Sequence, residues 1–228
     1  MKKTIWSLCY LVILLVSSTS VYATLIQLEN GSFEIPDIVN DEAGYYLINS
    51  ANLPSWETTA PQFEIWSNEF LGVKAYDGDQ HVELNSSQAG TLYQDLIGIT
   101  AGKNIGYEFA HRGRTGLDTM LLTITDMGLD GLFDTDDDFV LINQEFSTGK
   151  DDWVLYKAAN IGLSTGNNLR FAYTAVNTFS GDLTMGNFLD AVKFGVDVGR
   201  VVDVPEPSTL LIFGLGIVGL AFRRNKKI

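Results

Sequence analysis

Short stretches in which apolar and polar residues alternate recur between residues 63 and 194. A period of two places every second side chain on the same face of a β-strand. Clusters of Gly, Asn and Asp separate the stretches, and these residues favour turns. The stretches that predict strands are Phe63–Trp66, His81–Leu84, Leu92–Leu96, Ile105–Phe109, Met120–Ile124, Trp153–Tyr156, Leu169–Tyr173 and Ala191–Phe194.

Between residues 24 and 203 no long window repeats apolar residues at helical spacing, and no internal repeat or break in composition divides the segment. Regular short strands with turn residues between them predict a single all-β domain, an antiparallel β-sandwich or jelly roll. Trp66, Trp153 and Phe171 are predicted to lie in its core.

The first 23 residues have the features of a secretory signal peptide. Lys2 and Lys3 precede an apolar run from residue 5 to residue 16, and Val21-Tyr22-Ala23 is a small-x-Ala cleavage site. The chain has one cysteine and it lies inside this segment, at position 9. The processed protein therefore has no disulfide, thiolate metal site or cysteine nucleophile.

A second apolar run, from residue 209 to residue 222, lies near the other end of the chain. It is shorter than the ~20 residues that span a bilayer comfortably. Arg223, Arg224, Lys226 and Lys227 follow it, and such clusters favour the cytoplasmic side. We expect a transmembrane helix over about 209–222, with the acidic domain outside the membrane.

Residues 204–228 resemble a known sorting signal. The triplet Pro205-Glu206-Pro207, the apolar run and the basic pair Arg223-Arg224 stand in the order typical of the PEP-CTERM signal of exopolysaccharide-producing Gram-negative bacteria. The resemblance implies recognition by an exosortase-type membrane peptidase and cleavage near the triplet. It also implies a final location in the cell envelope or extracellular matrix. The alternative is a plain C-terminal anchor.

The predicted domain is strongly acidic. Residues 24–203 contain 27 Asp and Glu residues against 9 Lys and Arg, a net charge of −18, and the whole chain has −13. Such a surface repels nucleic acid phosphates and suits cations or an extracellular matrix. Solubility alone is the other interpretation of this charge.

A further resemblance covers most of residues 28–196. Short motifs at residues 30–34, 54–56, 77–85 and 188–192 are similar to those of galactose-binding-like jelly rolls, which include many carbohydrate-binding modules. The resemblance implies that the first and last strands are adjacent. It also implies that Glu34 and Asp190, with backbone carbonyls, hold a structural calcium ion. Leu189 stands where those families often have a second aspartate. The alternative for Glu34 is an exposed turn carboxylate.

Residues 126–138 are similar in spacing to a twelve-residue calcium loop, with Gly131 at the sharp turn. Gly128 at the third position and Asp137 at the twelfth depart from that pattern, which has a ligand and a glutamate there. The flanking residues predict strands. We expect either a calcium loop between two strands or a solvated acidic loop. The predicted oxygen ligands are Asp126, Asp130, the carbonyl of Leu132, Asp134 and Asp137.

Two groups of residues are candidates for ligand contacts. Aromatic residues in loops or at a sheet edge can stack on sugars, and these are Tyr45, Tyr46, Trp56, Trp66 and Tyr76, with Trp56 and Tyr76 the main candidates. His111, Arg112 and Arg114 can grip an anionic group. The alternatives are a core position for Trp56 and internal pairing of the arginines with Asp118, Glu108 or Asp95.

The sequence lacks the motifs of common hydrolases, zinc proteases and phosphate-binding loops. We therefore expect no enzyme but an exported module, stabilised by calcium, that binds extracellular polysaccharide. One alternative is a structural or adhesion protein of the matrix that binds calcium and proteins without sugar recognition. The other is a glycosidase or esterase with an atypical site.

Overall fold

The computed structural model describes residues 28–38 and 43–196. The predicted signal peptide, sorting signal and transmembrane helix lie outside these residues. The described helices are two short 3-10 turns, η1 (Ser50–Asn52) and η2 (Phe70–Gly72), and none in this part of the chain is long and apolar enough to cross a bilayer.

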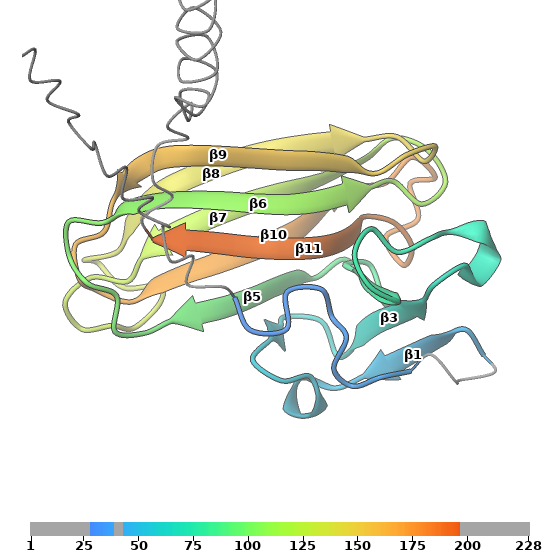
Figure 1. Cartoon of the computed structure of the whole chain (residues 1–228), viewed down its shortest axis with the longest axis horizontal. Coiled ribbons are helices and arrows are strands. Elements are labelled where there is room, and N and C mark those ends of the chain that lie inside the picture. Colours follow the sequence, from blue (N-terminus) through green and yellow to red (C-terminus); the bar gives the residue numbers. More distant parts are fainter. Residues whose placement is uncertain (1–27, 39–42, 197–228) are drawn as a thin grey trace, which may run out of the picture.

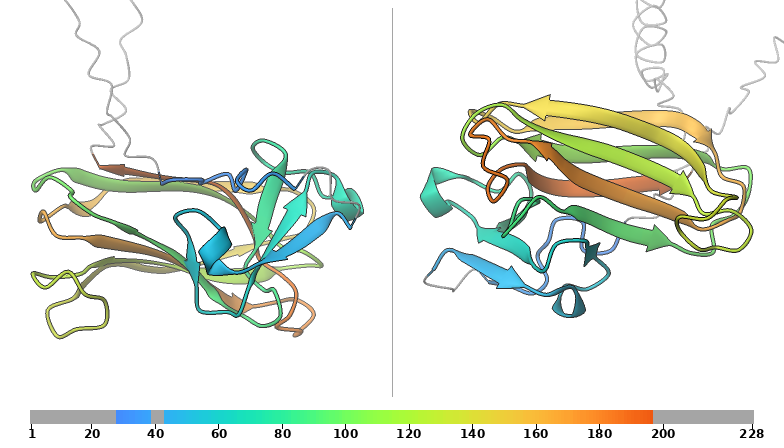
Figure 2. Two further views of the ribbon diagram at one scale, coloured as in Figure 1. Left: turned by 90° about the horizontal axis from the view of Figure 1, so that it is seen from below. Right: turned by 180° about the vertical axis from the view of Figure 1, so that it is seen from behind.

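Eleven strands in the described residues form two antiparallel sheets, which lie face to face (Figures 1 and 2). The larger sheet has six strands in the order β1-β3-β4-β11-β6-β9, and the smaller has five in the order β2-β5-β10-β7-β8. The strands are β1 (Tyr45–Ile48), β2 (Glu57–Thr58), β3 (Phe63–Ser67), β4 (Gln80–Glu83), β5 (Thr91–Leu96), β6 (Asn104–Arg112), β7 (Asp118–Asp126), β8 (Phe139–Thr148), β9 (Val154–Leu163), β10 (Leu169–Asn177) and β11 (Phe188–Val196).

The predicted all-β antiparallel sandwich is confirmed. The alternation of apolar and polar residues gives each strand one face for the core. In β7, Met120, Leu122 and Ile124 are fully buried, while the residues between them are half-buried on the outer face. One apolar cluster fills the space between the sheets, and Phe171 is part of it. Trp66 is also buried, but in a second cluster on the outer face of the six-stranded sheet.

The segment of residues 28–38 lies against β11, the last strand. The Val192 N–H donates to the Gly31 carbonyl at 2.8 Å. A Cβ on Gly31 would lie 2.0 Å from the Val192 carbonyl oxygen, so only glycine permits this approach. The two ends of the domain are therefore adjacent, as the second resemblance implies.

The loops gather at two opposite ends of the sandwich (Figure 1). Residues 97–103, 127–138 and 164–168 share one end, where backbone hydrogen bonds join Gly102 to Ser164 and Met127 to Asn168. Residues 113–117, 149–153 and 178–187 form the other end, beside β1, β3 and β4, which extend the six-stranded sheet there.

Candidate functional site

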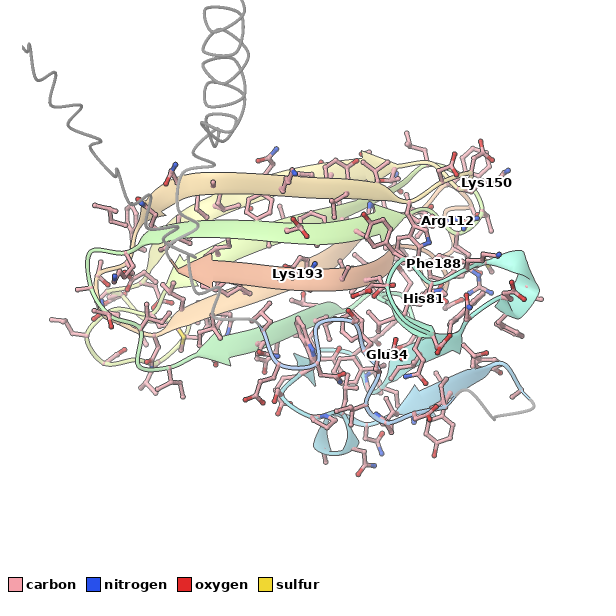
Figure 3. The ribbon with its side chains drawn as sticks, viewed as in Figure 1. Glu34, His81, Arg112, Lys150, Phe188 and Lys193 are labelled. Carbon is pink, nitrogen blue, oxygen red and sulfur yellow. The ribbon has the colours of Figure 1, made fainter. Side chains whose placement is uncertain are left out.

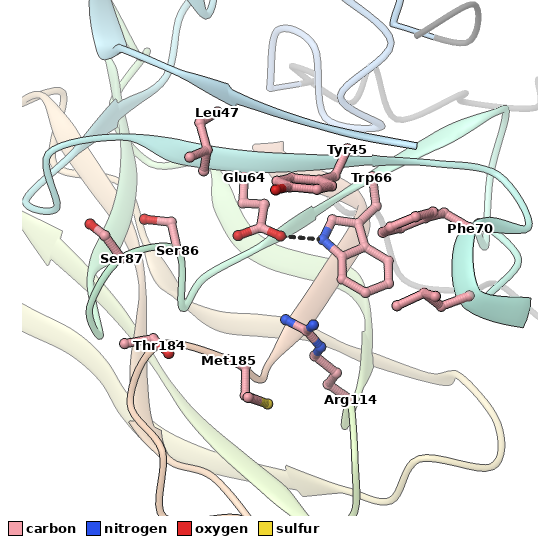
Figure 4. A pocket seen from close by; sticks show the side chains of 11 residues that line it. Tyr45, Leu47, Glu64, Trp66, Phe70, Ser86, Ser87, Arg114, Thr184 and Met185 are labelled. Carbon is pink, nitrogen blue, oxygen red and sulfur yellow. Dashed lines mark hydrogen bonds between the residues drawn. The ribbon is translucent and has the colours of Figure 1, made fainter. Parts of the chain in front are cut away.

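A pocket of about 440 Å³ opens at the edge of the six-stranded sheet, on the face that points away from the main core (Figure 4). Segments far apart in the sequence form its wall: β1, β3, η2, the residues after β4 and the loop before β11. The residues that line it are Tyr45, Leu47, Glu64, Trp66, Phe70, Leu71, Ser86, Ser87, Arg114, Thr184 and Met185.

Strand β3 supplies the floor of the pocket. Its alternation sends Phe63 and Ile65 into the main core and Glu64 and Trp66 to the opposite face. The Trp66 indole Nε1–H donates to the Glu64 carboxylate at 2.8 Å, and this bond is visible in Figure 4. The strand therefore places a carboxylate and an indole next to each other in a fixed orientation.

A second carboxyl group lies behind Glu64. Glu83 is directly opposite Glu64 in the β3–β4 register and its side chain is fully buried. Arg114 Nη1 donates to both Glu83 oxygens, at 3.0 and 2.9 Å, and the Gly186 N–H also donates to Glu83. Glu64 is its cross-strand neighbour, and the charge of Arg114 acts on both acids. Two carboxyl groups thus share one guanidinium.

Burial is the main cause that shifts the titration of both acids. Burial and then the neighbouring Glu64 raise the pKa of Glu83 to about 8, and Arg114 only partly offsets them. Burial also raises the pKa of Glu64. Because like charges this close cannot both ionise cheaply, the pair holds a proton near neutral pH.

Aromatic rings form the side of the pocket near η2. Phe70 meets Trp66 edge-on at 4.7 Å between ring centroids and lies 5.7 Å from Tyr45. The Arg114 guanidinium lies 4.7 Å from the Trp66 ring centroid, a cation–π distance. Tyr45 is 40% exposed, so its ring is open to a ligand, whereas Trp66 is buried.

His81 occupies the aromatic cluster next to the pocket. It lies 5.9, 5.4 and 4.9 Å from the ring centroids of Trp66, Trp153 and Phe188, and Figure 3 shows it beside Phe188. Both of its ring nitrogens are buried, and neither has a hydrogen-bond partner among the residues that the structure describes. Burial lowers the pKa of His81 to about 3, and Arg112 adds to this effect.

Replacing His81 with leucine is expected to raise the free energy of unfolding by about 1 kcal/mol at neutral pH, because two unpaired polar atoms leave an apolar site. The native imidazole stays neutral while the unfolded one protonates below its ordinary pKa of 6.5. His81 therefore costs stability as the pH falls from 6.5 toward 3. Urea denaturation at about pH 7 and about pH 5 measures this effect. The free energy of unfolding should fall less between these two pH values in His81→Leu than in the wild type.

His111→Leu is the matched control. His111 is also fully buried, but its Nδ1 pairs with Thr148 at 2.8 Å and its Nε2 with Asn187 at 3.1 Å. Its replacement removes the partner of the Asn187 side-chain oxygen and one of the hydrogen bonds of Thr148, so it should destabilise the protein at neutral pH. If His81→Leu lowered the free energy of unfolding at neutral pH as much as His111→Leu does, the prediction for His81 would be contradicted.

Of the candidates for ligand contacts, Tyr45, Trp66 and Arg114 line the pocket. The others, which are Tyr46, Trp56, Tyr76, His111 and Arg112, do not. Arg114 also has an internal partner, Glu83, which is not among the acids named from the sequence. Arg112 Nε donates to the Lys150 carbonyl at 2.8 Å. Tyr76 is 43% exposed and lies 6.3 Å from Trp153.

The predicted ligand contacts of Trp56 and His111 are wrong, because both side chains lie in the interior. Trp56 is 1% exposed, packs on Phe33 and Tyr173, and donates its indole N–H to the Asn30 carbonyl at 3.0 Å. The hydrogen bonds of His111 are all to other side chains of the protein.

The acidic loop joins β7 to β8, as expected for a loop between strands. Asp126 is buried and accepts hydrogen bonds from Thr165 and Asn167. The other predicted ligands are in the exposed part of the loop, where the Thr135 hydroxyl lies within 3.5 Å of four of its oxygens, which belong to Asp130, Leu132, Asp137 and Asp138. The Asp134 N–H donates to Asp138.

Glu34 and Asp190 contact the same turn, at residues 76–80. Glu34 accepts from the Asp79 and Gln80 N–H groups, both at 3.0 Å, and Asp190 accepts from those of Tyr76 and Asp77, at 2.8 and 3.0 Å. Burial raises the pKa of Glu34 and that of Asp190, the latter to about 7.

Among the described residues no group of three or more His, Cys, Asp or Glu side chains has an arrangement that could hold a metal ion. Calcium binding, both at the acidic loop and at Glu34 and Asp190, stays a prediction from the sequence.

Comparison with known proteins bears on both parts of the chain. Residues 203–226 match the PEP-CTERM protein-sorting motif. The predicted sorting signal is thereby confirmed, and the motif implies an exported chain anchored through its C-terminus. No functionally curated protein matches the sequence.

Solved structures similar to this PEP-CTERM-bearing chain include carbohydrate-binding modules. TmCBM61 in complex with β-1,4-galactotriose aligns with a TM-score of 0.47 and 16% identity, over 75% of this chain and 97% of that one. The CBM22-1 xylan-binding domain from Paenibacillus barcinonensis Xyn10C has a TM-score of 0.45 and 11% identity, over 62% and 85% of the two chains. A CBM4 structure has a TM-score of 0.38 and 14% identity, over 74% and 99%. Likeness of this strength says nothing about a ligand of the present chain.

Proposed function

We propose that this protein is a non-catalytic binding module that an exosortase-type peptidase sorts outside the cell and that takes extracellular polysaccharide in the pocket beside β3. The PEP-CTERM motif supports the exported location and the peptidase. The residues that line the pocket support polysaccharide as the ligand.

One observation carries the choice of ligand class: an open aromatic ring and convergent polar groups line the same pocket (Figure 4). Tyr45 offers a flat apolar surface of the kind that stacks on a sugar ring. Glu64, Arg114, Ser87 and Thr184 offer acceptors and donors of the kind that sugar hydroxyl groups pair with. A pocket with mainly apolar lining and a few placed polar groups is typical of small-ligand sites.

A binding role is favoured over catalysis because only one carboxyl group of the pair, Glu64, is accessible from the pocket. Glycosidases that use two carboxyl groups hold them roughly 5–9.5 Å apart, with the substrate between them. Here Glu64 and Glu83 are directly opposite each other on neighbouring strands, and the Glu83 side chain is fully buried behind Glu64 and Arg114. No substrate atom reaches the second acid.

Replacing Tyr45 with alanine is expected to weaken polysaccharide binding about tenfold, because ring stacking contributes about 1 kcal/mol or more. The melting temperature should change little, since Tyr45 is 40% exposed and β1 is an edge strand. Titration calorimetry of the full-length protein in detergent, against the glycans that bind it on an array, measures the effect.

Tyr46→Ala is the matched control. Tyr46 is the next residue of the same strand and is 47% exposed, but its side chain points to the other face of the sheet. Equal losses of affinity in the two variants would argue against this pocket. A protein that binds no glycan on the array would contradict the proposed function itself.

A further inference from the structure

The floor of the pocket has one negative charge more than it can pair. Glu64 and Glu83 contribute two carboxyl groups and Arg114 contributes one guanidinium. Arg114 spends Nη1 on the two oxygens of Glu83, the fully buried acid. Glu64 receives the neutral indole N–H of Trp66, while Arg114 acts on it through its charge.

Buried charges are costly unless a counter-charge or a proton compensates them. Without a ligand, a proton shared by the two acids compensates the extra charge, and their raised pKa values agree with this. A cation that enters the pocket next to Glu64 would do the same and would let both acids ionise. The site is therefore short of one positive charge at the position a ligand reaches.

The walls around Glu64 also suit a cation. Tyr45 and Phe70 line the same pocket, with ring centroids 5.7 Å apart, and the face of an aromatic ring attracts an ammonium group. The net charge of −18 over residues 24–203 also favours a cation, because it raises the concentration of cationic ligands near the protein.

We infer that the pocket takes the primary ammonium group of an amino sugar, with Glu64 as its counter-ion and the rings of Tyr45 and Phe70 beside it. This inference rests on the proposed function and names the ligand class of that site. A uronic acid would place its carboxylate next to Glu64, and an N-acetylated sugar would bring no charge. Partly deacetylated polysaccharides are thus favoured over acidic or fully acetylated ones.

The test compares two probes of equal length, a glucosamine tetramer and an N-acetylglucosamine tetramer, with the full-length protein in detergent at about pH 6. We expect the amine to bind the wild type at least about tenfold more tightly, the factor that corresponds to about 1.4 kcal/mol. Glu64→Gln keeps an acceptor for Trp66 but removes the charge. It should remove most of this preference, because the affinity for the amine falls by more than the affinity for the acetylated probe.

Glu69→Gln is the matched control, because Glu69 precedes Phe70 but is exposed and pairs with Lys74 at 3.3 Å. It should change the affinity of either probe by less than about twofold. Equal binding of the two probes by the wild type would overturn the inference and leave the proposed function standing. An equal loss in Glu64→Gln and Glu69→Gln would also overturn it, because overall charge would then explain the preference. The comparison of probes on the wild type needs no variant to fold.

Discussion

Replacing Arg114 with methionine is expected to lower the free energy of unfolding by about 3–5 kcal/mol above about pH 8, where Glu83 is ionised. This is the usual cost of leaving one member of a buried ion pair without its partner. Glu83 is the member left behind: its side chain is fully buried and takes both hydrogen bonds of Arg114 Nη1. The loss should be larger at alkaline pH than at about pH 5, because the acid must then ionise in the interior.

Two further variants isolate this cause. In Arg114→Met/Glu83→Gln the buried charge is gone, so much of the lost stability should return. Lys150→Met breaks an ion pair with Asp151 whose side chains are 56% and 84% exposed, and it should cost about 0.5 kcal/mol or less. Urea denaturation measures all three. A loss in Arg114→Met no greater than that in Lys150→Met would contradict the expected cost.

Replacing Trp56 with alanine is expected to cost about 3–5 kcal/mol, the range for large aromatic residues of a core. The side chain is 1% exposed and packs between Phe33 and Tyr173. Its indole N–H also holds the Asn30 carbonyl, so the substitution loosens the segment of residues 28–38 as well. Thermal and urea denaturation measure the loss.

Trp56→Phe separates packing from the hydrogen bond. It keeps most of the ring and should retain more stability than the alanine variant. Any loss of polysaccharide binding in Trp56→Ala should follow the fraction of protein that is unfolded. If Trp56→Ala kept the stability of the wild type but lost polysaccharide binding, Trp56 would be a ligand contact after all.

The sequence predicts every described strand that has neighbours on both sides, and among the edge strands it predicts β9. Residues 120–124 and 169–173 lie in β7 and β10, which are inside the five-stranded sheet, so one face of each must be apolar. β1, β2 and β8 were not predicted, and each is at the edge of a sheet. In β8, residues 139–145 are exposed or half-buried on both faces, so burial imposes no period of two.

Part of the pocket was also within reach of the sequence. The stretches at 63–66 and 81–84 place Glu64 and Glu83 opposite the core-facing Ile65 and Val82. A glutamate next to a core-facing apolar residue in each of two predicted strands is a usable signal for a buried polar site. The sequence gives no sign of which segments cover that face, because Phe70, Thr184 and Arg114 come from loops far apart in the chain.

The location of β11 bears on how the chain reaches its folded state during export. β11 ends at residue 196, close to the sorting signal, yet it lies between β4 and β6 in the middle of the six-stranded sheet. A chain that crosses the membrane N-terminus first cannot close this sheet until residues 188–196 have emerged. Pairings between distant segments also fold slowly. Completion of the domain is thus coupled to the arrival of the C-terminal segment, and a truncation before Phe188 removes the centre of a sheet and not its edge.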